Sequence, residues 1–328
     1  MVKRRLKFGL ILISVSAILI SLFSILEKEK LYRMTSGEYI KWVDFDVSEQ
    51  ALSDSLDLTL SLYKEGNKIS YSELLALLAA KYGGNFQRYK KSDLEAIVDR
   101  IRNGESINDI GKKYSYFSYF KDAYGAVLDG FVGEIYVNSE QYYGLRVFSP
   151  IASGYNFTHS DDFGAQRSYG YKRKHLGHDM MGSVGTPIIA VESGYVDSIG
   201  WNQYGGWRIG IRSFDNKRYY YYAHLRKGHP YAQDFKVGDT IIAGDVIGYL
   251  GMTGYSVKQD VNNINIPHLH FGLQLIFDPS QKDGYNQIWI DCYQIVKFLE
   301  RNKMSVVRTE DGKDFKAKTD VAIYDIPD

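Results

Sequence analysis

The pattern of hydrophobic positions changes along the 328-residue chain, and an uncharged apolar segment lies close to the N-terminus. Residues 9–26 carry no charge, and Lys3, Arg4 and Arg5 precede them. About eighteen apolar or small residues are just enough for a membrane-spanning helix. A basic flank stays in the cytoplasm, so residues 1–29 are predicted to be a cytoplasmic stub and an uncleaved membrane anchor. A cleaved signal peptide is the alternative, although its apolar core would be shorter and no Ala-x-Ala-like site follows.

Residues 30–145 show the apolar periodicity of amphipathic helices. Ser48 suits the N-cap of a helix that runs to about Lys64. No cluster of His, Cys or paired acids occurs in this region, so we expect a helical packing or spacer domain rather than a second enzyme, with a regulatory or wall-facing role left open. Further helices are expected at 74–82 before Gly83-Gly84, from Ser92 with Glu95 as a capping box to about Asn103, and in two pieces within 108–127.

After Phe148-Ser149-Pro150, glycine becomes frequent and apolar residues occur in short alternating runs. Such closely spaced strands predict a mainly antiparallel β domain over residues 146–300, and an α+β chain overall. Residues 301–328 are polar with weak periodicity and are predicted to be a tail or a minor appended element. The expected strands are 188–191, 194–199, 208–212, 218–223, 240–242, 246–250 and 266–275.

Two histidines, His268 and His270, lie two residues apart in the last expected strand. Alternate side chains of a strand point to the same face, so these imidazoles project together while Leu269 and Phe271 point the other way. The arrangement suits a metal ligand beside an acid–base group. For the pair alone, two surface histidines remain an equally good interpretation.

The remaining histidines support a single site. All seven fall between residues 159 and 270. His175 lies four residues before Asp179, and His224 lies between this pair and the later histidines. Two imidazoles and one carboxylate with a free fourth position would suit a catalytic zinc ion.

These segments resemble the signature of the M23, or lysostaphin/LytM-type, zinc endopeptidases of bacterial cell walls. The family pattern is H-x-x-x-D, then Y-x-H-L, then H-x-H, which are here His175 to Asp179, Tyr222 to Leu225, and His268 to His270. The resemblance covers about residues 145 to 278, in the right order. It implies a lysostaphin/LytM-type catalytic domain with two sheets and a narrow groove over the metal.

The resemblance also implies a role for each residue. One Zn²⁺ per chain would be bound by His175, Asp179 and His270, while His224 and His268 would stay uncoordinated as catalytic groups. One of these two would accept the proton of a zinc-bound water, and the other, or zinc itself, would stabilise the oxyanion. His178 is a competing ligand, but it occupies a variable position of the motif.

An insert, two further histidines and the single cysteine are not part of the predicted metal site. Residues 257–266 form an insert before Pro267 that the family lacks, which predicts a longer loop beside the groove that could reshape substrate choice or cover the site. His159 and His229 are weaker candidates because they lie in a polar loop and a turn. Cys292 is outside every motif and is predicted to be a buried apolar residue.

The composition and the motifs that are absent exclude two classes of function. A net charge of +1 gives no basic excess, so no nucleic-acid partner is expected. The absence of H-E-x-x-H excludes a zincin. Together with the export signal, the motifs predict a membrane-anchored, extracytoplasmic zinc endopeptidase acting on peptidoglycan peptides. A non-catalytic scaffold or activator with the same fold, and a metal-dependent hydrolase of another substrate, are the alternatives.

Overall fold

The computed structural model describes residues 39–284 and 286–323, and only these are discussed. The chain divides into two compact units, Met1–Val43 and Asp44–Asp328, of which the second contains every element below. The predicted membrane segment, residues 9–26, lies outside the described residues. Among the residues that are described, no helix combines the length and apolar character needed to cross a membrane.

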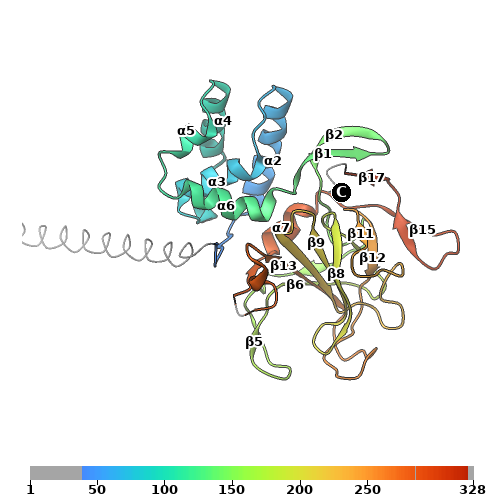
Figure 1. The fold of residues 1–328 in the computed structure, drawn as a ribbon. Coiled ribbons are helices and arrows are strands. Elements are labelled where there is room, and N and C mark those ends of the chain that lie inside the picture. The colour runs from blue at the N-terminus through green and yellow to red at the C-terminus, as the bar shows by residue number, and fades with distance from the viewer. Residues whose placement is uncertain (1–38, 285, 324–328) are drawn as a thin grey trace, which may run out of the picture. The chain divides into compact units, whose positions relative to one another are not determined.

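The N-terminal part of the second unit is helical, as its apolar periodicity predicts (Figure 1). Its helices are α2 (Glu49–Lys64), α3 (Tyr71–Tyr82), η1 (Phe86–Arg88), α4 (Lys91–Arg102), α5 (Ile107–Gly111) and α6 (Phe117–Leu128). Ser48 caps α2 as predicted, since its hydroxyl accepts a hydrogen bond from the Ala51 N–H at 3.3 Å. Gly83 ends α3 with a φ of 65°, a left-handed conformation that glycine adopts easily. The predicted capping box is wrong, because the N-cap of α4 is Lys90 and Ser92 lies in the first turn.

Helix α3 forms the centre of this helical region. Leu74, Leu75, Leu77 and Leu78 are all fully buried. A helix with little exposed apolar surface must pack on several neighbours, and α3 contacts α2, α5 and α6. Apolar burial is therefore the main source of stability in these helices.

Residues 132–145, which the helical expectation for 30–145 includes, form a hairpin instead. Strands β1 (Val132–Val137) and β2 (Glu140–Leu145) pair antiparallel through a turn in which Asn138 and Ser139 have φ values of 49° and 69°. Two left-handed residues in succession match the twist of a tight hairpin. Strand β17 (Val321–Ala322) pairs with the other edge of β1, so part of the expected C-terminal tail completes this sheet.

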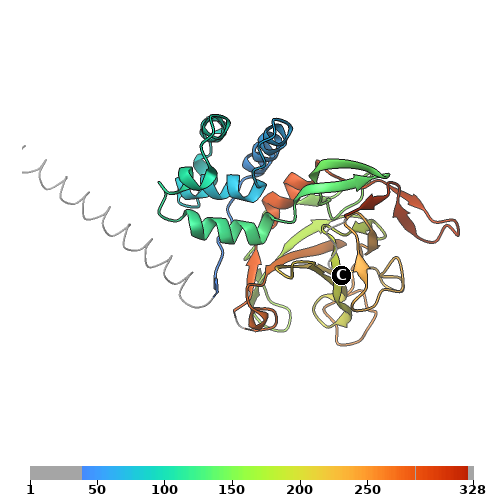
Figure 2. The ribbon, with the colours of Figure 1, turned by 45° about the horizontal axis from the view of Figure 1, so that its top comes forward.

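The mainly antiparallel β domain is confirmed, and Figure 2 shows it from a second direction. Its large sheet has the order β11-β8-β9-β10-β13-β6-β3, with β14 also beside β13, and β12 pairs with β7. Helix α7 (Tyr293–Leu299), which the sequence pattern did not reveal, follows β14. The strands are β3 (Thr158–His159), β4 (Gln166–Arg167), β5 (Arg173–Lys174), β6 (His178–Met181), β7 (Pro187–Ile189), β8 (Gly194–Asn202), β9 (Gly206–Ser213), β10 (Arg218–Ala223), β11 (Thr240–Ile241), β12 (Val246–Tyr249), β13 (His268–Leu275), β14 (Ile288–Ile290), β15 (Val306–Arg308) and β16 (Phe315–Ala317).

The register of the central strands decides which side chains meet. Ala223 of β10 lies opposite His270 of β13, and His270 lies opposite Asp179 of β6. Residues opposite one another share a face of the sheet, so His270 and Asp179 are adjacent on one face. Leu269 and Phe271 point the other way and are 0% and 1% exposed, which confirms the predicted alternation.

A buried ion pair joins the helices to the sheet. Arg218 of β10 donates from Nε to Glu192 Oε2 at 2.7 Å and from Nη1 to the Ala126 carbonyl of α6 at 2.8 Å. Both charged side chains are largely excluded from solvent. Because a buried guanidinium needs a compensating charge and hydrogen bonds, these contacts fix how the helices attach to the sheet.

Candidate zinc site

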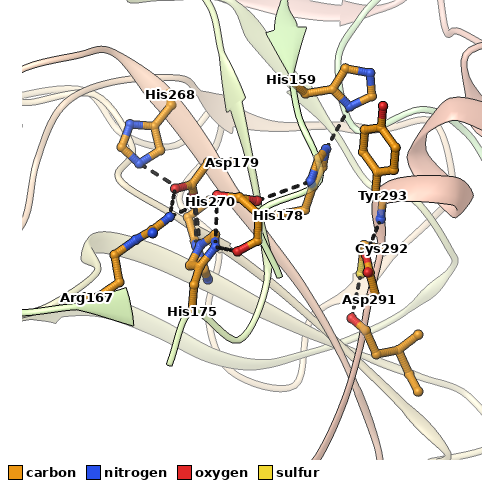
Figure 3. Close-up of polar contacts among 12 residues, drawn as sticks. His159, Arg167, His175, His178, Asp179, His268, His270, Asp291, Cys292 and Tyr293 are labelled. Atoms are coloured by element: carbon orange, nitrogen blue, oxygen red, sulfur yellow. Dashed lines mark hydrogen bonds and ion pairs between the residues drawn. The ribbon is translucent and has the colours of Figure 1, made fainter. Parts of the chain in front are cut away.

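Three side chains direct one ligand atom each toward a common point (Figure 3). His175 Nε2 lies 2.8 Å from His270 Nδ1, and Asp179 Oδ1 lies 3.0 Å from each of these nitrogens. His175 precedes β6, Asp179 lies within it, and the opposed register brings His270 alongside. Gly177 and Gly182 favour a loop over residues 175–179, but the chain forms strand β6 from His178 onward. The structure brings together the predicted metal ligands.

Gly177 makes the close approach of these segments possible. A Cβ at this position would lie 2.6 Å from ring atoms of His270 and 2.8 Å from the Phe271 carbonyl. Contacts that short do not occur for real side chains, so any larger residue would push β6 away from β13. The glycine of the H-x-x-x-D segment therefore serves the geometry of the site.

The electrostatics of the three residues favour a cation. Burial alone would lower the pKa of His175, but hydrogen bonds with Asp162 and Asp179 outweigh it and raise that pKa to about 9. Burial disfavours the charged form of Asp179, yet its contacts with His175 and His270 hold its pKa well below the usual range. The carboxylates thus draw positive charge to the point where the ligand atoms converge.

The donor set fits zinc. Tetrahedral ligands about 2.0–2.1 Å from zinc stand roughly 3.3 Å apart, close to the separations observed here. Two imidazole nitrogens and one carboxylate oxygen are ordinary zinc ligands, and three protein ligands leave one position free.

Asp162 and Arg167 form a second layer around the ligands that the sequence analysis did not identify. Asp162 Oδ2 lies 3.0 Å from His175 Nδ1, which fixes the ring so that Nε2 faces the metal position. Arg167 Nη2 is 2.9 Å from both Asp162 Oδ2 and Asp179 Oδ2. It thereby occupies one oxygen of Asp179 and leaves Oδ1 for the metal. No spacing rule links these residues, because the β4–β5 hairpin and its flanking loop bring them in.

His224 and His268 lie beside the three ligands with defined tautomers. His224 Nδ1 is 2.9 Å from the Thr253 carbonyl, and His268 Nδ1 is 2.7 Å from the Ile266 carbonyl. A ring nitrogen facing a carbonyl must carry the proton, so Nε2 of each ring is left as the acceptor. The two rings are 4.8 Å apart, and His268 Nε2 is 3.8 Å from Asp179 Oδ1. Burial, together with His268 and His270, holds the pKa of His224 well below its ordinary value, so it is neutral.

The other histidines are not part of the ligand cluster. His178 is buried on the opposite face from Asp179, where its Nε2 is 2.7 Å from His159 Nδ1 (Figure 3). His229 Nε2 contacts Asp314 Oδ1 at 2.5 Å, away from the cluster. Cys292 is fully buried, as predicted.

A cleft of about 460 Å³ opens over the site. Its lining includes the three ligand residues and His224, and it extends along the sheet to Arg208, Tyr219, Tyr221 and Trp289. The insert borders this cleft indirectly. Asn263 Nδ2 donates to the carbonyl of Tyr255, a lining residue, at 2.6 Å, while Val257 and Ile266 are 83% and 60% exposed.

The fold and the donor set are consistent with a zinc peptidase domain. Residues 173–283 match the model of Peptidase family M23 and form an M23 peptidase domain. Zinc is the cofactor of peptidases of this family, in agreement with the donor set. The recognition of this family from the His175, His224 and His268 segments is confirmed.

Among individual proteins, the chain is 37% identical to the L-Ala–D-Glu endopeptidase of Bacillus subtilis over 46% of its own length and 43% of the relative's. It is 40% identical to lysostaphin of Staphylococcus simulans over 30% of its length and 17% of the relative's. The chain thus spans less than half the length of these relatives. A LytM crystal structure from Ruminococcus gnavus shares the fold, with a TM-score of 0.53 and 21% identity over 80% of this chain and 91% of that one.

Proposed function

We propose that this protein is a zinc endopeptidase that hydrolyses peptide bonds in bacterial peptidoglycan. The observation that carries the proposal is the convergence of His175 Nε2, Asp179 Oδ1 and His270 Nδ1 in a cleft that His224 also lines, with the His268 ring 4.8 Å from that of His224. The similarity to a Bacillus subtilis protein named as an L-Ala–D-Glu endopeptidase makes the bond between L-Ala and D-Glu the first to test.

In this mechanism His175, Asp179 and His270 hold the zinc ion. Bound zinc supplies Lewis acidity, which polarises the peptide carbonyl and acidifies a water molecule. Either His224 or His268 accepts the proton of the attacking water at Nε2, because both rings keep their own proton on Nδ1. The ring that accepts this proton carries it on Nε2 and donates it to the leaving amine. The oxyanion is stabilised by zinc, or by the other ring in its doubly protonated form, in which Nε2 carries a proton. Arg167 and Asp162 orient the ligands.

The remaining chain suits an enzyme that works outside the cytoplasm. Residues 9–26 serve as a single membrane span after a basic flank, which leaves the catalytic domain on the outer side of the membrane. The helices of residues 49–128 act as a packing domain attached through Arg218, since their buried residues are mainly apolar.

The test is digestion of purified peptidoglycan by the zinc-loaded protein, followed by mass spectrometry of the released muropeptides. We expect new peptide termini from the wild type and none from His268→Ala, with His229→Ala as a matched control that still cleaves. If the wild type binds one zinc per chain but releases no fragment, the protein is a scaffold rather than an enzyme.

A further inference from the structure

The cations that line the cleft differ in their partners. Arg167 contacts Asp162 and Asp179, and Lys282 Nζ is 2.5 Å from Asp197. Lys174 is exposed to solvent, and Arg173 donates to the Tyr169 carbonyl and lies over Tyr204. Arg208 is half-buried and makes no ion pair with any described residue. Its one side-chain hydrogen bond runs from Nη1 to Ser198 Oγ at 2.8 Å, and its Nε is buried without a partner.

A half-buried guanidinium with a single hydroxyl partner is costly to leave unpaired. Burying a charge without a counter-charge loses hydration that one neutral hydrogen bond does not replace. The nearby Asp197 does not serve, because Lys282 and Arg212 contact its carboxylate. Arg208 also lines the cleft, so a ligand there can reach the guanidinium.

The sheet places Arg208 in the same row as the metal site. Tyr222 of β10 pairs with Ile209 of β9, so Arg208 lies one residue further along, next to Ala223. Ala223 pairs with His270. Two strand spacings of about 4.8 Å separate the backbones of Arg208 and His270, roughly 10 Å in all, which is the span of a few extended residues. A group bound at Arg208 would therefore sit close to the bond that is cut.

Ser198 keeps the guanidinium in place. Its hydroxyl bonds the Tyr219 hydroxyl at 2.7 Å as well as Arg208, so the side chain is anchored before a ligand arrives. Tyr221 and Trp289 form aromatic walls of the same part of the cleft, with their rings 6.4 Å apart. A guanidinium anchored in a cleft that aromatic side chains also line matches a planar carboxylate on a peptide.

We propose that Arg208 forms a carboxylate-binding subsite, which makes the enzyme selective for an acidic residue adjacent to the scissile bond. This inference rests on the proposed function and specifies the substrate class of the same site. The Arg208 guanidinium binds the substrate carboxylate equally in the ground state and in the transition state. Loss of this contact therefore raises KM and leaves kcat nearly unchanged.

The experiment compares two synthetic peptides with the zinc-loaded protein. Both contain an L-Ala–D-Glu bond and continue through the γ-carboxyl group of D-Glu, whose α-carboxyl group is free in one peptide and amidated in the other. For the wild type we expect kcat/KM to be about 10- to 100-fold higher on the free carboxylate, as a charge-assisted hydrogen bond would give. In Arg208→Gln this ratio should fall to near one through KM, and Arg208→Lys should retain part of it.

Arg226→Gln is the matched control, because it removes the same charge at a position outside the cleft lining, where the guanidinium lies over Tyr249. It should keep the wild-type ratio, and all variants should keep one zinc per chain. Equal cleavage of both peptides by the wild type, or an unchanged ratio in Arg208→Gln, overturns the subsite while leaving the proposed function intact.

A different result separates the two proposals. If the wild type cleaves neither peptide and releases nothing from peptidoglycan, the proposed function fails. Calorimetric binding of the free-carboxylate peptide then tests Arg208 alone. Weaker binding to Arg208→Gln, by about 10-fold or more, supports the carboxylate subsite. Equal binding to wild type and variant overturns it.

Discussion

The helices of residues 49–128 and the sheet that carries the zinc site bury different kinds of side chain. Helix α3 buries leucines and alanines and makes its contacts through apolar packing. One face of β10 and β13 is mainly apolar, with Tyr222 and Phe271 buried, and its charged residue Arg218 is paired with Glu192. The other face of the sheet gathers His270 of β13, Asp179 of β6 and Arg208 of β9, which are charged or titratable groups that oppose folding unless partners compensate them. Apolar packing therefore dominates in the helices and on one face of the sheet, whereas the titratable groups of the candidate site gather on the other face.

The largest effect should follow loss of a metal ligand. Asp179→Asn keeps the shape of the side chain but removes its charge. We expect zinc content and peptidoglycan cleavage each to fall more than about 100-fold, beyond the usual effect of outer-shell partners. Elemental analysis and muropeptide release measure the two quantities. Full zinc retention in this variant would show that Asp179 is not a ligand.

A second large effect concerns stability at the junction of the two regions. Arg218→Leu leaves Glu192 buried without its counter-charge, so urea unfolding should show a loss of about 3–5 kcal/mol. Arg301→Gln is the matched control, because the Arg301–Asp57 pair also joins α2 to the α7 end of the β domain but lies at the surface. Its loss should cost less than about 1 kcal/mol. If both variants lost the same free energy of unfolding, burial would not explain how much each ion pair contributes to stability.

Arg167 should have an intermediate effect on the metal and little effect on the fold. In Arg167→Gln, Asp179 Oδ2 loses its cationic partner, so zinc affinity should fall about 10- to 100-fold in competition with a chelator. Excess zinc should restore cleavage. Arg173→Gln removes a charge from the neighbouring strand that does not contact Asp179 and should leave zinc affinity unchanged. If both variants lose the same zinc affinity, the effect comes from the total positive charge near the site and not from the contact between Arg167 and Asp179.

The smallest effect is expected in the helical region. Gly83→Ala places a side chain at a φ of 65°, which should destabilise the protein by about 1 kcal/mol without a steric clash. Zinc content and cleavage rate should not change while the protein is folded. A reduced cleavage rate in the folded variant would show that the helices affect the site as well as the stability of the protein.

Part of this arrangement follows from local sequence. The alternation around His268 and His270 predicts their shared face, the Ser48 cap and Gly83 predict the ends of two helices, and the spacing of the motifs indicates the metal ligands. These signals are local because strand periodicity, capping and turn conformation depend on a few neighbouring residues.

Other parts do not follow from local patterns. The β1–β2 hairpin lies within a region of helical periodicity, α7 is only seven residues long, and the first turn of α4 has no side-chain cap. Short elements such as these form because tertiary packing supports them, not because their own sequence requires them.

Local sequence patterns predict the antiparallel β domain, the residue types of the candidate metal site and the M23 match of residues 173–283. Three relations come from tertiary structure alone: Arg167 and Asp162 contact the predicted ligands, His178 lies on the opposite face, and Arg208 lies in the row of the candidate site without an ion pair to any described residue. They depend on strand register and on contacts between segments far apart in the chain, where a shift of one residue would turn each side chain to the opposite face.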